Sequence, residues 1–140
     1  MTHETHSSAE LHDFVVALYE GLGDRAAFDE RLHPVVTVWE SADPRLLRGI
    51  DQLDELRGPA AAENDRETPL PSVVPVDIVA ENWGETGLIR YVLEVRPSIA
   101  EPLIDRVRVT DVLRKSDAGW KIVHHHAQDL GPEDSAEAGK

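Results

Sequence analysis

The residues best suited to chemistry lie near the end of the chain, where Asp111 precedes three consecutive histidines, His124 to His126. The sequence contains no cysteine, so a catalytic group would have to be a histidine, a carboxylate, a hydroxyl or an arginine. A carboxylate beside an imidazole is suited to proton transfer. Side chains alternate along a strand, so His124 and His126 converge while His125 points away. We therefore predict that Asp111, His124 and His126 share one enclosed pocket and that His125 is dispensable.

The register of the last hairpin decides whether these side chains can meet, because a shift of one residue moves every side chain to the other face. A three-residue loop would line the cavity with Arg108 and Thr110. A four-residue loop would instead place Asp111 opposite His124. Burial favours the four-residue loop, because the apolar side chains of both strands then share one face. These side chains are Val107, Val109, Leu113, Trp120 and Ile122.

Hydrophobic periodicity predicts the elements that position these residues. Ser7 or Ser8 caps a first helix, Asp24 caps a short second helix, and a third helix opens at Asp51. Segments rich in β-branched residues predict strands near residues 35–39, 73–79, 86–96, 105–115 and 119–128. Helices followed by antiparallel strands predict an α+β fold, in which the N-terminal helices pack on one face of a strongly bent, mostly antiparallel sheet. Such an arrangement leaves a cavity between the two layers.

Composition limits the classes of partner. The 140 residues suffice for one domain. The 27 acidic residues outnumber the 14 basic ones and give a net charge of -13, which repels phosphate backbones and anionic lipids. We therefore expect no nucleic-acid and no membrane partner, and the polar start of the chain, unlike a signal peptide, favours a cytoplasmic protein. We predict a folded domain over 8–130, a disordered N-terminus over 1–7 and a disordered acidic tail over 131–140.

One motif resembles a known family. Residues 119–126, GWKIVHHH, resemble the Trp-x-x-Val-His-x-His ending of the SnoaL-like branch of the nuclear transport factor 2-like superfamily. The resemblance spans roughly residues 8–128 and implies a cone-shaped barrel with a small-molecule pocket. This branch includes the association domain of calcium/calmodulin-dependent kinase II, in which a pocket arginine sits on the preceding long strand. Arg90 matches that arginine.

The ketosteroid isomerases of the same superfamily offer a second comparison. This resemblance implies a general base at Glu40, which follows the first strand, and a hydrogen-bond donor to the enolate oxygen at Asp111. Tyr19 does not align convincingly with the isomerase tyrosine, so the resemblance does not imply isomerisation of a steroid. We expect Trp39 or Glu40 to lie in the same pocket as Asp111.

These observations predict a small-molecule-binding SnoaL-like protein. Its activity would be that of a cofactor-independent isomerase, cyclase or dehydratase, which transfers protons on a small apolar carbonyl or polycyclic compound. The alternative is a non-catalytic ligand-binding or oligomerisation domain, since the fold alone does not choose between them. The predicted catalytic residues are Glu40, Asp111, His124 and His126. The predicted ligand-binding residues are Trp39, Trp83, Arg90, Tyr91 and Gln128.

Two further expectations concern metals and partners. Two convergent histidines and one carboxylate would make a three-ligand metal set, but this spacing arises easily by chance, so we expect no metal and no cofactor. The expected partners are a small-molecule ligand and a second copy of the chain. We predict a homodimer because the outer sheet face needs cover at Val112, Val123 and Ala127, and because this superfamily commonly pairs through that face.

Overall fold

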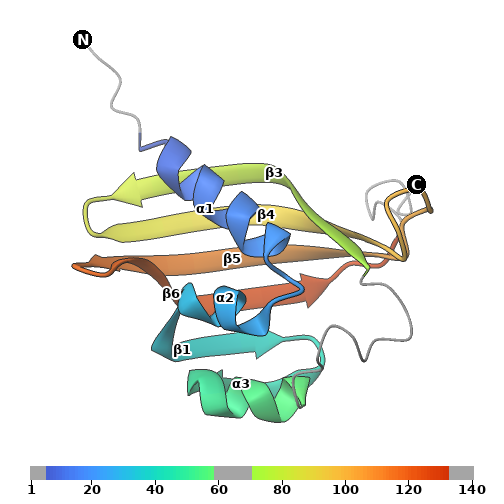
Figure 1. Cartoon of the computed structure of the whole chain (residues 1–140), viewed down its shortest axis with the longest axis horizontal. Coiled ribbons are helices and arrows are strands. Elements are labelled where there is room, and N and C mark those ends of the chain that lie inside the picture. Colours follow the sequence, from blue (N-terminus) through green and yellow to red (C-terminus); the bar gives the residue numbers. More distant parts are fainter. Residues whose placement is uncertain (1–5, 59–70, 133–140) are drawn as a thin grey trace.

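The computed structural model describes residues 6–58 and 71–132 (Figure 1). The helices are α1 (Ala9–Glu20), α2 (Arg25–Glu30) and α3 (Gly49–Arg57). The strands are β1 (Leu32–Glu40), β2 (Asp43–Arg48), β3 (Ser72–Trp83), β4 (Thr86–Arg96), β5 (Asp105–Ser116) and β6 (Gly119–Asp129). They form one sheet in the order β2-β1-β6-β5-β4-β3, with every neighbouring pair antiparallel except β1 and β6. The predicted α+β class with a mostly antiparallel sheet is confirmed.

Helices α1 and α2 begin where their capping residues predict, whereas α3 begins at Gly49, before the predicted Asp51. All three helices cover one face of the sheet (Figure 1). Ser8 accepts a hydrogen bond from the Leu11 N–H at 3.1 Å, and Asp24 accepts one from the Ala27 N–H at 3.2 Å. Helix α1 lies across β3 and β4, while α3 packs on β1 and β2 (Figure 1). The side chains that α1 buries are Leu11, Val15, Leu18 and Tyr19.

Gly87 in β4 lets α1 approach the sheet closely. A Cβ atom at this position would lie 2.8 Å from Leu11 Cδ1 and 3.2 Å from Trp120 Cζ3. Contacts this short would force the helix or the indole ring to move, because protein cores are already close-packed. The absence of a side chain at Gly87 therefore helps to fix the distance between the two layers.

The segment before α1 extends the sheet at its β3 edge. The His6 carbonyl accepts a hydrogen bond from the Asn82 N–H at 2.7 Å, and Ser7 forms an isolated bridge with Glu81. The His6 ring stacks on Trp83 with 3.5 Å between ring centroids. Residues 6 and 7 therefore pair with the sheet. Disorder was predicted for residues 1–7 and 131–140, and of these only residues 6, 7, 131 and 132 are among the described residues.

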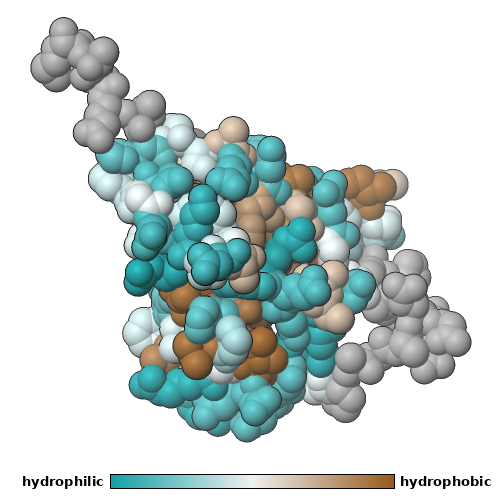
Figure 2. Space-filling view, turned by 60° about the vertical axis from the view of Figure 1, so that its left-hand side comes forward, coloured by the Kyte–Doolittle hydropathy of each residue, from teal (hydrophilic) through white to brown (hydrophobic). Residues whose placement is uncertain are grey.

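The surface follows the acidic composition of the chain. Figure 2 shows a largely hydrophilic face, on which apolar side chains gather in limited patches, mainly in the lower half of the view. In the described part of the chain, no helix combines the length and apolar character that crossing a membrane requires.

A β-bulge in β6 sets the register of the last hairpin. Near the turn Lys115 pairs with Trp120, as a four-residue loop requires. Val123 is then an extra residue on β6, and beyond it Asp111 pairs with His125. A bulge shifts the pairing by one residue. Each of the two competing registers therefore holds in one half of the hairpin.

Candidate functional site

The bulge decides which histidine meets Asp111. Asp111 is fully buried on the helix-covered face of the sheet, and its Oδ1 lies 2.6 Å from His125 Nδ1. His124 and His126 flank His125 on the strand and point to the outer face. The prediction that Asp111, His124 and His126 share one pocket is therefore wrong, and so is the expectation that His125 points away. The extra residue in β6 reversed the faces of all three histidines.

Two tyrosines continue a hydrogen-bond chain from Asp111. Tyr91 donates its hydroxyl proton to Asp111 Oδ2 at 2.6 Å, and the Tyr19 and Tyr91 hydroxyl oxygens lie 2.7 Å apart. Because Tyr91 has already donated its proton, Tyr19 donates to the Tyr91 oxygen. A carboxylate only accepts, so His125 donates through Nδ1. Nε2 of His125 is then the ring nitrogen that can meet a ligand.

Burial and charge set the proton affinities along this chain. Burial raises the pKa of the Tyr19 and Tyr91 hydroxyls, and the negative charge of Asp111 raises both further, so both remain protonated donors. Burial lowers the pKa of His125, but the charge of Asp111, the hydrogen bond to it and the charge of Glu40 together outweigh burial. The pKa of His125 is therefore raised above its usual value of 6.5.

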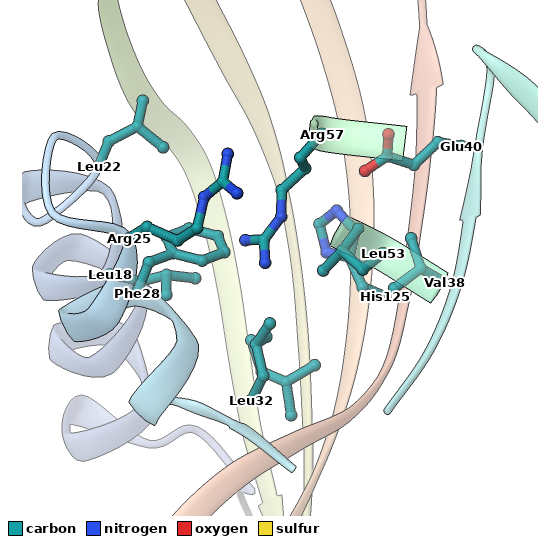
Figure 3. Close-up of a pocket in the computed structure, with 11 residues that line it drawn as sticks. Leu18, Leu22, Arg25, Phe28, Leu32, Val38, Glu40, Leu53, Arg57 and His125 are labelled. Atoms are coloured by element: carbon teal, nitrogen blue, oxygen red, sulfur yellow. The ribbon is translucent and has the colours of Figure 1, made fainter. Parts of the chain in front are cut away.

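His125 lines a cavity of about 230 Å³ between the helices and the sheet (Figure 3). The apolar wall consists of Leu18, Leu22, Phe28, Leu32, Val38, Leu53 and Ile122. The polar residues of the lining are Arg25, Glu40, Arg57 and His125. A mostly apolar lining with a few polar groups suits a small ligand that carries one or two polar atoms.

Arg57, the last residue of α3, joins that helix to α2 at the cavity. Its Nη1 and Nη2 donate to Asp29 at 2.8 and 3.0 Å, and Nη2 also donates to Asp54. Burial lowers the pKa of Arg57, whereas these hydrogen bonds raise it and prevail. Its Nε is buried and, within the described residues, has no hydrogen-bond partner. Arg25, the second cavity arginine, donates to the Gly58 carbonyl at 2.7 Å.

His124 and His126 form an aromatic cluster on the outer face with Trp39. The ring centroid of Trp39 lies 5.7 Å from that of His124 and 5.9 Å from that of His126, in edge-to-face contacts. Thr37 Oγ1 lies 2.7 Å from His124 Nδ1. Burial lowers the pKa of His124, and the neighbouring His126 and His125 lower it further. Across residues 6–58 and 71–132, no three histidine or carboxylate side chains are grouped to hold a metal ion.

Other predicted ligand-binding residues also lie on the outer face. Arg90 pairs with Glu81 at 2.6 Å, and Gln128 accepts a hydrogen bond from Arg108 Nε at 2.8 Å. Arg90 and Gln128 line a separate, open hollow of about 490 Å³. Ala127, predicted to face outward, packs against the core instead, because it lies beyond the bulge. Homodimer formation through this face stays a prediction.

The remaining predicted site residues lie in the cavity lining, behind it or away from it. Glu40 lines the cavity, whereas Asp111 and Tyr91 stand behind His125 and are buried. Trp83 is half exposed at the end of β3, away from the cavity lining. Four further residues of the site were not predicted from the sequence: Tyr19, Arg25, Arg57 and His125.

The stability of the fold is expected to depend on pH through two histidines whose pKa values shift in opposite directions. The pKa of His125 is raised by folding, so its contribution to stability is present below the unfolded value of about 6.5 and is lost as the pH rises through the folded pKa. The pKa of His124 is lowered by folding, so its contribution is present above about 6.5 and is lost as the pH falls through the folded pKa.

Urea unfolding at a series of pH values from about 5 to about 9 measures both effects. Relative to the unmodified protein, His125→Gln should flatten the decline in stability above about pH 6.5. His124→Gln should flatten the decline below that value. If His125→Gln left the alkaline decline unchanged, the charged pair between His125 and Asp111 would not contribute as described.

The fold, with its cavity between the helices and the sheet, is an α+β cone of the nuclear transport factor 2-like type. A family model described as the SnoaL-like domain matches residues 22–127. The protein therefore belongs to the SnoaL-like domain family, and the resemblance inferred from its closing motif is confirmed. No functionally curated protein matches the sequence.

Solved structures agree with this family. The calcium/calmodulin-dependent kinase II hub homology domain of Chlamydomonas reinhardtii is 20% identical with a TM-score of 0.70, over 87% of this chain and 97% of that one. A proposed dehydratase of the NTF2-like family from Streptomyces avermitilis is 22% identical with a TM-score of 0.64, over 86% of this chain and 93% of that one. A proposed ketosteroid isomerase from Parabacteroides distasonis is 17% identical with a TM-score of 0.63, over 93% of this chain and 98% of that one. At these identities the similarity establishes the fold alone.

Proposed function

We propose that the protein binds a small, largely apolar compound in the cavity and transfers a proton on it without a cofactor. The observation that supports this most is the His125 ring, which lines the cavity while its Nδ1 is held by the fully buried Asp111. A histidine held in this way has a fixed tautomer, and its second nitrogen serves as a general base or acid.

The proton transfer assigns a role to each group. Nε2 of neutral His125 removes a proton from a carbon next to a carbonyl. The electron pair of the C–H bond forms a C=C bond to the carbonyl carbon, and the π pair of the C=O bond moves onto the oxygen. If a C=C bond adjoins the enolate, the protonated ring returns the proton to the far carbon of the dienolate, the carbonyl re-forms and the double bond has moved. If the β-carbon carries a hydroxyl, the ring protonates it, the C–O bond breaks, water leaves and the enolate pair forms the new C=C bond. Asp111 positions the ring and stabilises its charged form. Tyr91 donates to the carboxylate from the other side, and Tyr19 donates in turn to Tyr91.

This proposal changes two roles that the sequence predicted. Asp111 accepts two hydrogen bonds and has no side-chain surface in the cavity, which favours a positioning role over that of a donor to the substrate. Glu40 remains a second proton-transfer group, because it lines the cavity. The isomerase and dehydratase names of the structural relatives support proton transfer as the class of reaction, whereas the hub domain name supports the non-catalytic alternative.

The test uses 5-nitrobenzisoxazole, whose ring opens to a coloured phenolate when a base removes its single heterocyclic C–H proton. We expect saturable turnover that rises with pH and has a midpoint above about 6.5, because His125 must be neutral to act as the base. Binding is followed separately through the ring signals of His125 in NMR spectra. Binding without turnover would support a non-catalytic ligand domain, and no binding at all would overturn the proposed cavity ligand.

A further inference from the structure

Arg57 brings a buried hydrogen-bond donor to the cavity that the protein itself does not satisfy. Both terminal nitrogens of the guanidinium are bound to Asp29 or Asp54, but Nε is buried and lacks a partner among the described residues. Leaving a buried donor unpaired costs free energy, and the cost is larger when the group is charged. Figure 3 shows the Arg57 side chain reaching into the cavity from the end of α3. A ligand that supplies an acceptor would remove this cost.

The charges around the cavity indicate what kind of acceptor this is. Two arginines line it, but Arg57 is neutralised by Asp29 and Asp54, and Arg25 lies 3.8 Å from the same Asp54. Glu40 adds a further carboxylate to the lining. The cavity therefore has no excess positive charge to offset the desolvation of an anionic ligand. An uncharged acceptor such as a carbonyl oxygen fits better.

We infer that the cavity selects an uncharged carbonyl compound whose oxygen accepts a hydrogen bond from Arg57 Nε. Arg57 then also stabilises the negative charge that develops on this oxygen when His125 removes the adjacent proton. The bidentate contact with Asp29 fixes the guanidinium plane before the ligand arrives, so the donor needs no reorganisation during the reaction. This inference rests on the proposed function, which it makes more specific.

Three compounds with the same ring system test it: indane, 1-indanone and indane-1-carboxylate. Their binding to the full chain is measured by NMR titration, with the Nε–H signal of Arg57 as the local probe. We expect 1-indanone to bind about tenfold more tightly than indane and to shift the Arg57 Nε–H signal downfield. We expect the carboxylate to bind more weakly than the ketone. Tighter binding of the carboxylate, or an Nε–H signal that ignores the ketone, would overturn the inference.

Arg57→Lys keeps the positive charge beside its two carboxylates but removes Nε–H. It should abolish the preference for the ketone, so that 1-indanone binds no more tightly than indane. Arg45→Lys is the matched control, because Arg45 also pairs with two carboxylates, Asp43 and Glu55, but is not part of the cavity lining. If indane and 1-indanone bind equally well, the role of Arg57 fails and the proposed cavity ligand stands. If none of the three compounds binds, the proposed function fails with it.

Discussion

Asp111→Ala is expected to lower the free energy of unfolding by about 3–5 kcal/mol at neutral pH, because removing one member of a buried, hydrogen-bonded charge pair leaves the other without its counter-charge. His125 would lose the carboxylate that its Nδ1 contacts at 2.6 Å, and the Tyr91 hydroxyl would lose its acceptor. The truncation also opens a small cavity beneath the helices, which adds to the loss. Urea unfolding monitored by circular dichroism measures the change.

Two variants separate the buried pair from a general loss of charge. Asp117→Ala removes a carboxylate from the exposed hairpin turn and should change stability by less than about 0.5 kcal/mol. Tyr91→Phe removes one of the two donors to Asp111 and should cost about 1–2 kcal/mol, less than the loss of the carboxylate. A cost below about 1 kcal/mol for Asp111→Ala would mean that the carboxylate is not the centre of a buried pair.

The local patterns of the sequence predict most of the fold. Ser8 and Asp24 cap their helices as expected, and the long strands follow segments rich in β-branched residues. Strand β2 was not predicted, because Asp43-Pro44 is typical of a turn. Proline is tolerated here because β2 lies at the edge of the sheet, where no further strand needs its missing N–H.

The candidate site was predicted only in part, for reasons of geometry. Asp111 stood out as the lone acid on an apolar face, and the structure buries it completely. Which histidine contacts Asp111 depends on the bulge at Val123. The apolar and polar pattern of the sequence does not indicate this bulge. With three histidines in a row, each register offers Asp111 an imidazole, so the sequence does not reveal which one it meets.

Arg57 illustrates a different limit. The helix stop at Gly58 places this arginine in the last turn of α3, which is a local signal. Its contact with Asp29 on α2 and its place in the cavity depend on how the two helices pack, and no local pattern specifies that packing. Local patterns therefore predict the elements better than they predict the side chains that meet between them.

The second large effect is expected in the turnover of 5-nitrobenzisoxazole. His125→Gln should reduce the rate by about 100-fold or more, because the glutamine amide has no basic nitrogen and general base catalysis contributes about 10²–10⁴-fold. The same substitution on the outer face, His124→Gln, should leave the rate within about twofold, since that ring contacts Trp39 and Thr37 outside the cavity. Both variants exchange one imidazole for the same amide on the same strand. A difference in their rates therefore reports the position of the histidine, inside or outside the cavity.

Glu40→Gln completes this comparison, because Glu40 and His125 are both basic groups of the cavity lining. If His125 is the base, Glu40→Gln should leave the midpoint of the pH profile above about 6.5, and only His125→Gln should remove that transition. Loss of turnover in Glu40→Gln with full activity in His125→Gln would assign the proton transfer to Glu40 and return His125 to a structural partner of Asp111.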